Sequence, residues 1–395
     1  MASFKELIRQ VKSEVREVSV EETGALAARG AAVVDVREAD EWEKGHFPGA
    51  VFIPRGFLEL RIEEKVKDKT RPIVVYCAGG TRSALAAKTL LDLGYSEVTS
   101  LAGGFTRWRE AGQPVVVPRV LNAGQRERYS RHLRIPEVGE AGQARLLEAK
   151  VLLVGAGGLG CPAGLYLAAA GVGTLGIADF DVVDLSNLQR QVLHTAASVG
   201  RRKTESAAAA LLALNPDVRV VRHDERLEAR NVMGVIEPYD VIVDGSDNFT
   251  TKYLVNDAAV LAGKPSVYGS IFRFDGQATV FVPRQGPCYR CLFPEPTPPE
   301  LASSCDEAGV LGVLPGVVGL IQATEAVKLI LGRGRSLAGR LLTFDALEMA
   351  FREYRVARDR DCAVCGERPT IRDVKDLEWS CHIGTTPREA ATAGA

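Results

Sequence analysis

The feature that most constrains the fold is the stretch 151–190, where a short apolar run enters a glycine-rich turn. The run Val151–Val154 is too short for a helix, so we predict a buried parallel strand. The turn carries four glycines in the pattern G-x-G-G-x-G: Gly155, Gly157, Gly158 and Gly160. An apolar, Ala-rich segment then continues to Gly171 and predicts a helix. A strand, a glycine turn and a helix place backbone N–H groups where they can bind phosphate.

The residues after this turn narrow the choice of ligand, because dinucleotide, flavin and ATP-dependent enzymes all build such a turn. A second predicted strand, Leu175–Ala178, ends at Asp179, where a carboxylate can meet a ribose hydroxyl group. Further polar candidates follow: Ser186, Asn187, Gln189, Arg190, Lys203, Asp247 and Asn248. The two cations, Arg190 and Lys203, and the acid Asp247 suit a triphosphate with a magnesium ion. They have no clear task around a nicotinamide.

Four motifs occur in order in this part of the chain: GxGGLG, DFDxVxxSNLQRQ, the lysine of GxxK, and DxxDN. They resemble the MoeB/ThiF family, the ubiquitin-activating-enzyme-like adenylyltransferases that act on small sulfur-carrier proteins. The resemblance covers about residues 123–366. It implies a Rossmann-like ATP-binding domain with a mixed sheet, and ATP and Mg²⁺ as cofactors. It also implies a small ubiquitin-like carrier protein ending in Gly-Gly as partner.

The same resemblance implies roles for individual residues. Asp179 would bind the ribose. The residues that would orient phosphates, neutralise their charge or hold magnesium are Asn187, Arg190, Lys203 and Asp247. Arg131 matches a family arginine that reaches across a homodimer toward the nucleotide. Without the resemblance, the charged run 126–132 fits a solvent-exposed helix face equally well.

The N-terminal part predicts a small α/β domain with a parallel sheet, since predicted strands and helices alternate along it. The strand Pro72–Cys77 runs into Cys77-Ala-Gly-Gly-Thr-Arg82-Ser, and a helix follows. Loop N–H groups, a helix N-terminus and Arg82 each favour a thiolate, so we predict that Cys77 is nucleophilic. The alternative is an inert, buried thiol. Phosphatase loops are similar but place five residues between cysteine and arginine, whereas here there are four.

This loop and its surroundings resemble the rhodanese family across about residues 15–117. The resemblance rests on four further segments: Asp35–Glu38, Trp42, Gly45–Ala50 and Leu101–Gly104. It implies that Cys77 carries a persulfide sulfur, with a cysteine desulfurase or thiosulfate as the sulfur donor. His46 is expected to be structural rather than catalytic.

Four of the eight cysteines form two C-x-x-C pairs: Cys288, Cys291, Cys362 and Cys365. Together they offer the four thiolates of a structural zinc site, provided that the fold joins the pairs. A redox disulfide in either pair is the alternative. Cys305 is separate and is predicted to lie on a loop over the nucleotide site. Its position matches a family cysteine assigned to a covalent intermediate with the carrier protein, and a bystander thiol is the alternative.

Composition excludes several classes of protein. Lys plus Arg number 49 and Asp plus Glu 50, which gives no electrostatic signature of nucleic-acid binding. Charges occur throughout residues 1–17, and the apolar stretches are broken by glycine or charge. We therefore expect no signal peptide, no membrane span and a cytoplasmic location.

The predicted organisation has four parts. They are a rhodanese-like domain at 15–117, a linker at 118–124, an adenylyltransferase domain at 125–368 and a polar tail at 369–395. An amphipathic helix at Phe4–Val15 is expected to pack on the first domain. The better-known fusions of these two domains place the rhodanese part last, whereas here it comes first.

The predicted function is ATP-dependent adenylylation of the carrier protein's Gly-Gly carboxylate, followed by sulfur transfer from Cys77 to give a thiocarboxylate. Three alternatives remain open. They are an NAD- or FAD-dependent oxidoreductase with an appended rhodanese domain, a non-catalytic scaffold, and another ATP-dependent member such as a tRNA-base dehydratase. The pathway is also open among molybdopterin, thiamine and cysteine synthesis and tRNA thiolation.

Overall fold

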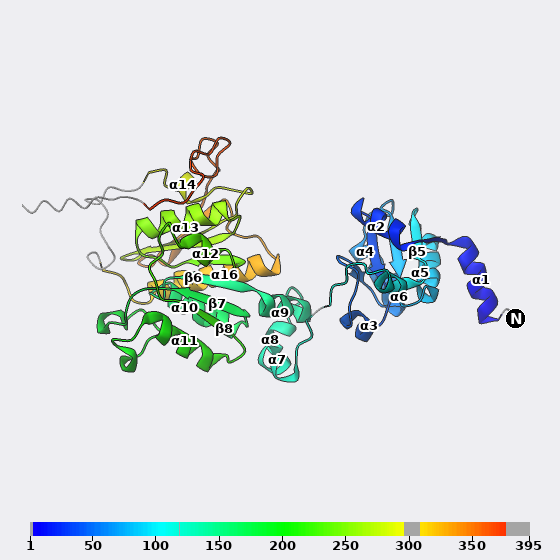
Figure 1. Cartoon of the computed structure of the whole chain (residues 1–395), viewed down its shortest axis with the longest axis horizontal. Coiled ribbons are helices and arrows are strands. Elements are labelled where there is room, and N and C mark those ends of the chain that lie inside the picture. Colours follow the sequence, from blue (N-terminus) through cyan, green and yellow to red (C-terminus); the bar gives the residue numbers. More distant parts are fainter. Residues whose placement is uncertain (1–2, 118, 296–308, 377–395) are drawn as a thin grey trace, which may run out of the picture. The chain divides into compact units, whose positions relative to one another are not determined.

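A computed structural model of the chain describes residues 3–117, 119–295 and 309–376 (Figure 1). The chain divides into two compact units, and the division falls between Asn122 and Ala123. Each unit has its own sheet. The α/β class expected from the sequence is confirmed, with a parallel sheet in the first unit and a mixed sheet in the second.

The N-terminal unit has a five-stranded parallel sheet in the order β1-β5-β4-β2-β3. Its strands are β1 (Arg16–Val18), β2 (Ala32–Asp35), β3 (Val51–Phe52), β4 (Ile73–Tyr76) and β5 (Val98–Leu101). Its helices are α1 (Phe4–Glu14), α2 (Val20–Ala28), α3 (Ala39–Glu43), α4 (Leu58–Lys65), α5 (Thr81–Asp92) and α6 (Gly104–Glu110), with a 3-10 turn η1 (Arg55–Phe57).

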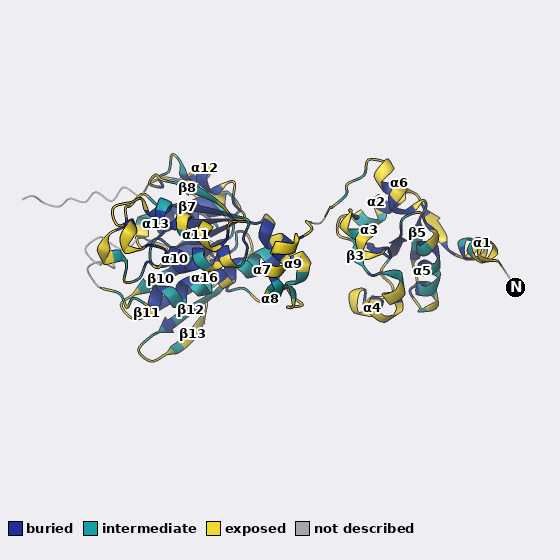
Figure 2. Cartoon of the chain, turned by 90° about the horizontal axis from the view of Figure 1, so that it is seen from below, coloured by how far each residue is buried: buried dark blue, intermediate teal, exposed yellow. Residues whose placement is uncertain are grey.

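Two apolar cores cover the two faces of this sheet. Helices α1, α4 and α5 pack in one core, and α2 and α6 pack in the other. Strands β2 and β4 are buried at every position, because a parallel strand is covered on both faces. In Figure 2, buried positions of this unit are dark blue, and exposed positions of its outer helices are yellow. The expected N-terminal helix is present, and it packs on α5 through the buried Val11.

The C-terminal unit has an eight-stranded mixed sheet in the order β13-β12-β11-β10-β9-β6-β7-β8. Its strands are β6 (Lys150–Val154), β7 (Thr174–Ala178), β8 (Arg219–His223), β9 (Val241–Asp244), β10 (Ser266–Phe272), β11 (Asp275–Phe281), β12 (Arg340–Asp345) and β13 (Ala350–Arg355). Its helices are α7 (Ala123–Arg128), α8 (Ser130–Leu133), α9 (Gly139–Glu148), α10 (Gly160–Ala169), α11 (Lys203–Leu214), α12 (Val232–Ile236), α13 (Phe249–Leu261), α14 (Tyr289–Leu292) and α16 (Leu314–Leu331), with 3-10 turns η2 (Leu185–Asn187) and η3 (Ala196–Ser198).

Strands β8, β7, β6, β9 and β10 are parallel, and β10 to β13 pair antiparallel. Helices α10, α11 and α16 pack on one face, and α12 and α13 on the other (Figure 1). Strand β6 lies between β7 and β9. The strands that follow it in sequence therefore lie on opposite sides of it, β7 and β8 on one side and β9 and β10 on the other. Such a reversal opens a ligand-binding crevice at the carboxyl ends of the strands.

Helix α16 is long and apolar enough by composition to cross a membrane, but it is the core helix of this unit. Half of it is buried, and it contacts α10, β10 and β11. Pro315 stands in its first turn, and Gly332 ends it with a φ of 61°. Its apolar character therefore reflects burial against the sheet.

The segments near the expected domain boundaries make the following contacts. Val116 pairs with His46 through two backbone hydrogen bonds of 2.8 and 2.9 Å, and α7 already begins at Ala123. Part of the expected tail is attached to the C-terminal unit. The side chain of Val374 packs beside α12 and α13, and Asp376 Oδ1 accepts a 2.8 Å hydrogen bond from the Ala229 N–H.

Gly160 provides a direct test of how the fold positions the glycine turn. A Cβ atom built there would lie 1.9 Å from the carbonyl oxygen of Gly155, so the start of α10 must shift in a Gly160→Ala variant. We expect the free energy of unfolding to fall by about 2–4 kcal/mol, measured by chemical denaturation. Gly316→Ala in α16 is the matched control, because nothing lies within 4 Å of its added Cβ. Equal losses in both variants would contradict the packing argument.

Candidate functional site

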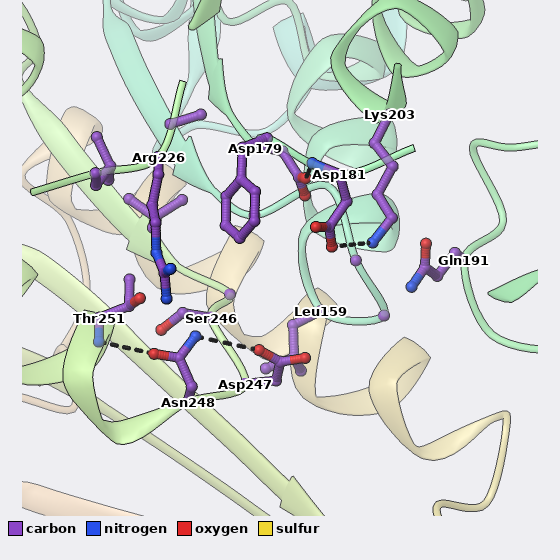
Figure 3. A pocket seen from close by; sticks show the side chains of 18 of the residues that line it. Leu159, Asp179, Asp181, Gln191, Lys203, Arg226, Ser246, Asp247, Asn248 and Thr251 are labelled. Atoms are coloured by element: carbon purple, nitrogen blue, oxygen red, sulfur yellow. Dashed lines mark hydrogen bonds and ion pairs between the residues drawn. The ribbon is translucent and has the colours of Figure 1, made fainter. Parts of the chain in front are cut away.

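A pocket opens at the carboxyl ends of β6, β7 and β9, at the strand-order reversal (Figure 3). It is lined by eight of the residues that the sequence nominated: Gly155, Gly157, Gly158, Asp179, Arg190, Lys203, Asp247 and Asn248. These residues span more than ninety positions of sequence. The fold brings them together because all of them except Arg190 lie where a strand ends or a helix begins at one edge of the sheet.

The glycine turn depends on close backbone contacts. Gly155 has a φ of 94°, and a Cβ there would lie 3.1 Å from the carbonyl oxygen of Gly245 at the end of β9. A Cβ at Gly158 would lie 3.2 Å from the ring of Pro315. Side chains at these points would separate β6, β9 and α16. The glycines therefore keep the turn tight and leave its backbone facing the pocket.

Asp179 holds the turn in place. Its carboxylate accepts 2.8 Å hydrogen bonds from the N–H groups of Ala156 and Asp181. Burial raises the pKa of Asp179, while these hydrogen bonds and the charge of Lys203 act in the opposite direction. This carboxylate therefore has a structural task in addition to the ribose contact expected from the sequence.

Lys203 is the first residue of α11 and is buried. Its Nζ atom lies 2.8 Å from Asp181 Oδ2, the ion pair drawn in Figure 3. Asp181 lines the pocket and stands in the DFD motif, yet the sequence reading gave it no role. A lysine held by one half-exposed carboxylate is in place to meet a phosphate oxygen.

Asp247 and Asn248 lie at the opposite wall of the pocket. Asn248 is the N-cap of α13, and its Oδ1 accepts a 2.9 Å hydrogen bond from the Thr251 N–H. Asp247 is exposed and accepts a 3.4 Å hydrogen bond from Asn248 Nδ2 (Figure 3). An exposed carboxylate beside a phosphate-binding turn is a suitable ligand for a divalent cation.

Five nominated residues lie outside the pocket lining: Gly160, Ser186, Asn187, Gln189 and Arg131. Ser186 donates a 2.6 Å hydrogen bond to Asp184, and Asn187 Oδ1 accepts one of 3.1 Å from the Asp184 N–H, so both shape the turn before Arg190. Gln189 lies against Gly312, where an added Cβ would be 2.3 Å from Gln189 Oε1. Arg131 is exposed on α8, and its cross-dimer contact stays a prediction.

Sequence reasoning missed several lining residues, including Phe180, Gln191 and Arg226. The Arg226 guanidinium lies 5.3 Å from the centre of the Phe180 ring. Arg226 follows β8, so extending the strand-end rule to that strand would have found it. Gln191 is buried, and its Oε1 has no hydrogen-bond partner among the described residues. A bound ligand could supply that partner, but the sequence carries no signal for it.

The Cys77 loop joins β4 to α5 in the N-terminal unit. The N–H of Gly80 donates to Cys77 Sγ at 3.1 Å, and Ser83 Oγ lies 3.5 Å from the same sulfur. The loop carbonyls face away, because the Phe105 N–H at the start of α6 binds the Cys77 oxygen at 2.7 Å. A Cβ at Gly104 would lie 2.4 Å from that oxygen, which explains the glycine at the first position of α6. The loop thus turns the Gly80 N–H and the Ser83 hydroxyl toward the thiol.

Arg82 and His46, two other polar residues of the N-terminal unit, make contacts with α3 and its neighbours. The Arg82 guanidinium binds Glu41 of α3 through two hydrogen bonds of 2.7 and 2.8 Å, which raise the pKa of Arg82. His46 stacks on Trp42 with ring centres 3.5 Å apart, and its Nδ1 lies 2.9 Å from the Phe47 oxygen. Burial lowers the pKa of His46. These contacts agree with the structural role expected for His46.

The four cysteines of the two C-x-x-C pairs converge, with all Sγ atoms within 4.8 Å of one another. The Sγ separations are 3.6 Å for Cys288–Cys362 and 3.4 Å for Cys291–Cys365. A disulfide is about 2.05 Å long, whereas tetrahedral Zn–S bonds of about 2.3 Å place sulfurs about 3.8 Å apart. The cluster therefore has the dimensions of a four-thiolate metal site.

Helix α13 anchors one of the two cysteine pairs. Arg290, inside the first C-x-x-C, binds Asp257 through two 2.8 Å hydrogen bonds in a buried ion pair. The Tyr289 N–H donates to Asn256 Oδ1 at 2.8 Å. Cys305, expected over the nucleotide site, lies outside the described residues, as does Cys381.

Comparison with known proteins agrees with this geometry. The ThiF family matches residues 129–364, and the rhodanese-like domain family matches residues 19–111. A "Sulfur carrier protein adenylyltransferase" from Thermus thermophilus is 54% identical over 262 residues, which cover 65% of this chain and 97% of that protein. A "Probable adenylyltransferase/sulfurtransferase MoeZ" from Mycobacterium tuberculosis is 52% identical over 287 residues, 71% of this chain and 72% of that protein.

A solved structure of E. coli MccB with MccA-N7isoASN has a TM-score of 0.55 and 24% identity. It covers 62% of this chain and 76% of MccB, and it supports the fold alone.

The fold and the pocket thus define a nucleotide-binding α/β unit that is joined to a unit with a cysteine loop. The chain belongs to the ThiF family and carries an N-terminal rhodanese-like domain. Relatives at about half identity are named adenylyltransferase and sulfurtransferase.

Proposed function

We propose that this chain uses ATP to adenylylate the C-terminal Gly-Gly carboxylate of a small ubiquitin-like sulfur-carrier protein, and then converts it to a thiocarboxylate. The observation that carries the proposal is the convergence of the glycine turn, Lys203, Arg190 and Asp247 on one pocket. Phosphate charge is neutralised by such N–H groups and cations. The names of the relatives support the choice of a carrier protein as substrate.

In the first step the carrier carboxylate attacks the α-phosphate of ATP and releases pyrophosphate. The turn N–H groups, Arg190 and Lys203 stabilise the charge that develops on the phosphate oxygens. Asp179 holds the ribose, and Asn248 lies beside the phosphates. Mg²⁺, held by Asp247, would supply charge neutralisation on the leaving phosphates. The protein positions the nucleotide, and the protein's own N–H dipoles do not have to reorganise during the reaction.

In the second step the terminal sulfur of a persulfide on Cys77 attacks the acyl adenylate, AMP leaves, and the carrier is held on Cys77 as an acyl disulfide. A second thiol, for which Cys305 is the candidate, then attacks the Cys77 sulfur, forms a disulfide with it and releases the carrier thiocarboxylate. The Gly80 N–H stabilises negative charge on the sulfur, and the Ser83 hydroxyl, which accepts from the Cys77 thiol, can rotate to donate once the sulfur is deprotonated. We propose a cysteine desulfurase or thiosulfate as the sulfur source. Arg131 would reach the nucleotide of a second subunit in a homodimer.

An oxidoreductase with the same glycine turn is the main competing function. Lys203 with Asp181, and Asp247 with Asn248, give the pocket cations and acids that a nicotinamide or flavin would leave without a task. A non-catalytic scaffold would be expected to have lost charged residues of the pocket, and Arg190, Lys203 and Asp247 are all present. The adenylyltransferase is therefore the function that these residues support best.

Asp247 tests the first step. Asp247→Asn removes the carboxylate proposed to hold magnesium, so we expect ATP–pyrophosphate exchange in the presence of carrier to fall about a hundredfold or more. Asp373→Asn is the matched control, because Asp373 is an exposed aspartate outside the nucleotide pocket. Exchange at the native rate in Asp247→Asn would count against the assignment.

Cys77 tests the division of labour between the two units. Cys77→Ala should abolish the ATP-independent transfer of sulfur from thiosulfate to cyanide, because no other group of the loop can carry the sulfur. ATP–pyrophosphate exchange should stay within about twofold of the native rate, since the pocket is unchanged. The Asp247→Asn protein should show the reverse pattern. Equal loss of both activities in Cys77→Ala would refute separate sites.

The cysteine cluster is proposed to hold structural zinc. We expect about one zinc per chain by elemental analysis, and we expect Cys365→Ser to lose it and to unfold at a lower temperature. Cys161→Ser is the control, because Cys161 is buried beside Ala156 and is not part of the cluster. Full zinc content in Cys365→Ser, or a disulfide between the pairs, would contradict the site.

A further inference from the structure

The Cys77 loop contains one charged side chain, and that side chain is already paired. From Cys77 to Ser83 the loop reads Cys-Ala-Gly-Gly-Thr-Arg-Ser, so Arg82 is its sole cation. Arg82 Nη1 lies 2.7 Å from Glu41 Oε2, and Nη2 lies 2.8 Å from Glu41 Oε1. Such a bidentate pair fixes the geometry of both groups. The guanidinium is thus committed to a residue of α3.

The Arg82–Glu41 pair adds no net positive charge beside the thiol. The hydrogen bond to Glu41 raises the pKa of Arg82, and the hydrogen bond from Arg82 lowers the pKa of Glu41. Both groups therefore stay ionised around neutral pH, and their charges cancel. Glu38 lies 4.0 Å from the same Nη1 and contributes a further negative charge.

Neutral donors serve the sulfur instead. The Gly80 N–H donates to Cys77 Sγ. The Cys77 thiol donates to Ser83 Oγ at 3.5 Å, and this hydroxyl can rotate to donate to the sulfur once the thiol is deprotonated. Ser100 donates a 2.9 Å hydrogen bond to Ser83, and both serines are fully buried. This chain of hydroxyl groups can stabilise one negative charge on the sulfur. It gives little stabilisation to a sulfur donor that carries two negative charges.

We propose that Glu41 sets the sulfur-donor preference of Cys77 by cancelling the charge of Arg82, so that persulfides are favoured over thiosulfate. This inference rests on the sulfur transfer proposed above. The Cys77 thiolate attacks the terminal sulfur of R–S–SH, a new S–S bond forms at Cys77, the donor S–S bond breaks, and its electron pair leaves on R–S⁻. The same attack on thiosulfate releases sulfite.

The two donors differ in charge. Thiosulfate approaches the thiolate as a dianion, whereas a persulfide brings at most one negative charge. A loop without net positive charge therefore penalises thiosulfate more strongly. Glu41 acts through Arg82 and is a positioning residue, not a catalytic one.

Glu41→Gln tests the proposal, because it removes the negative charge and keeps an oxygen that can accept from Arg82 and from the Glu38 N–H. We expect kcat/KM for thiosulfate to rise on the order of tenfold, and kcat/KM for cysteine persulfide generated in the assay to change by less than about twofold. The gain with thiosulfate should shrink as ionic strength rises. A purely structural ion pair would not produce this donor-specific, salt-dependent change.

Asp40→Asn is the matched control. Asp40 lies on the same helix, undergoes the same change of charge and pairs with Lys44 at 2.9 Å. It should leave both donors unchanged. The proposal is overturned if Glu41→Gln leaves the ratio of the two kcat/KM values unaltered, if it weakens both donors equally, or if Asp40→Asn raises thiosulfate transfer as much.

Mass spectrometry of the peptide that contains Cys77 distinguishes a failure of the donor preference from a failure of the sulfur transfer itself. If the native protein gains a sulfur atom faster from cysteine persulfide than from thiosulfate, both the transfer and the preference stand. If it gains sulfur equally fast from both donors, the preference fails and the transfer stands. If Cys77 gains no sulfur from either donor, the proposed transfer fails and the preference fails with it.

Discussion

The close approach of backbone to backbone around the glycine turn is the constraint on which the nucleotide pocket depends. Gly160 lies against the Gly155 carbonyl oxygen, and Gly155 lies against Gly245, so the ends of β6 and β9 meet the start of α10 without an intervening Cβ. Asp179 then fixes the turn through the Ala156 N–H. Because the backbone is held in this way, its N–H groups and the positive charge of Lys203 can face one ligand.

The rhodanese-like domain uses the same device for different chemistry. Gly104 allows α6 to approach the Cys77 carbonyl oxygen, so the loop presents donors to the thiol. One chain thus carries a pocket suited to activating a carboxylate and a thiol suited to holding sulfur. Covalent linkage of two such sites raises their effective concentration without requiring tight association between them. The ion pair of Arg82 with Glu41 adds the proposed discrimination between sulfur donors at Cys77.

Features encoded by local pattern were predictable from the sequence. The bounds of helices α11 and α16 can be predicted, because their apolar periodicity and their end signals are contained in the segments themselves. The partners of charged residues were not predictable. The Lys203–Asp181 and Arg82–Glu41 pairs join segments about twenty and forty residues apart, and their formation depends on how the elements pack. Arg226 was missed for a simpler reason, since the strand-end rule was not applied to β8.

The central claim is that ATP-driven activation and sulfur delivery meet on one carrier terminus. Intact-mass spectrometry of a Gly-Gly-ended ubiquitin-like carrier, incubated with ATP, Mg²⁺ and the sulfur-loaded protein, tests it most directly. The account predicts that one carboxylate oxygen of the carrier is replaced by sulfur, that AMP forms in equal amount, and that neither product appears without ATP. A carrier whose mass stays unchanged while AMP accumulates, or one that gains sulfur in the absence of ATP, would contradict it.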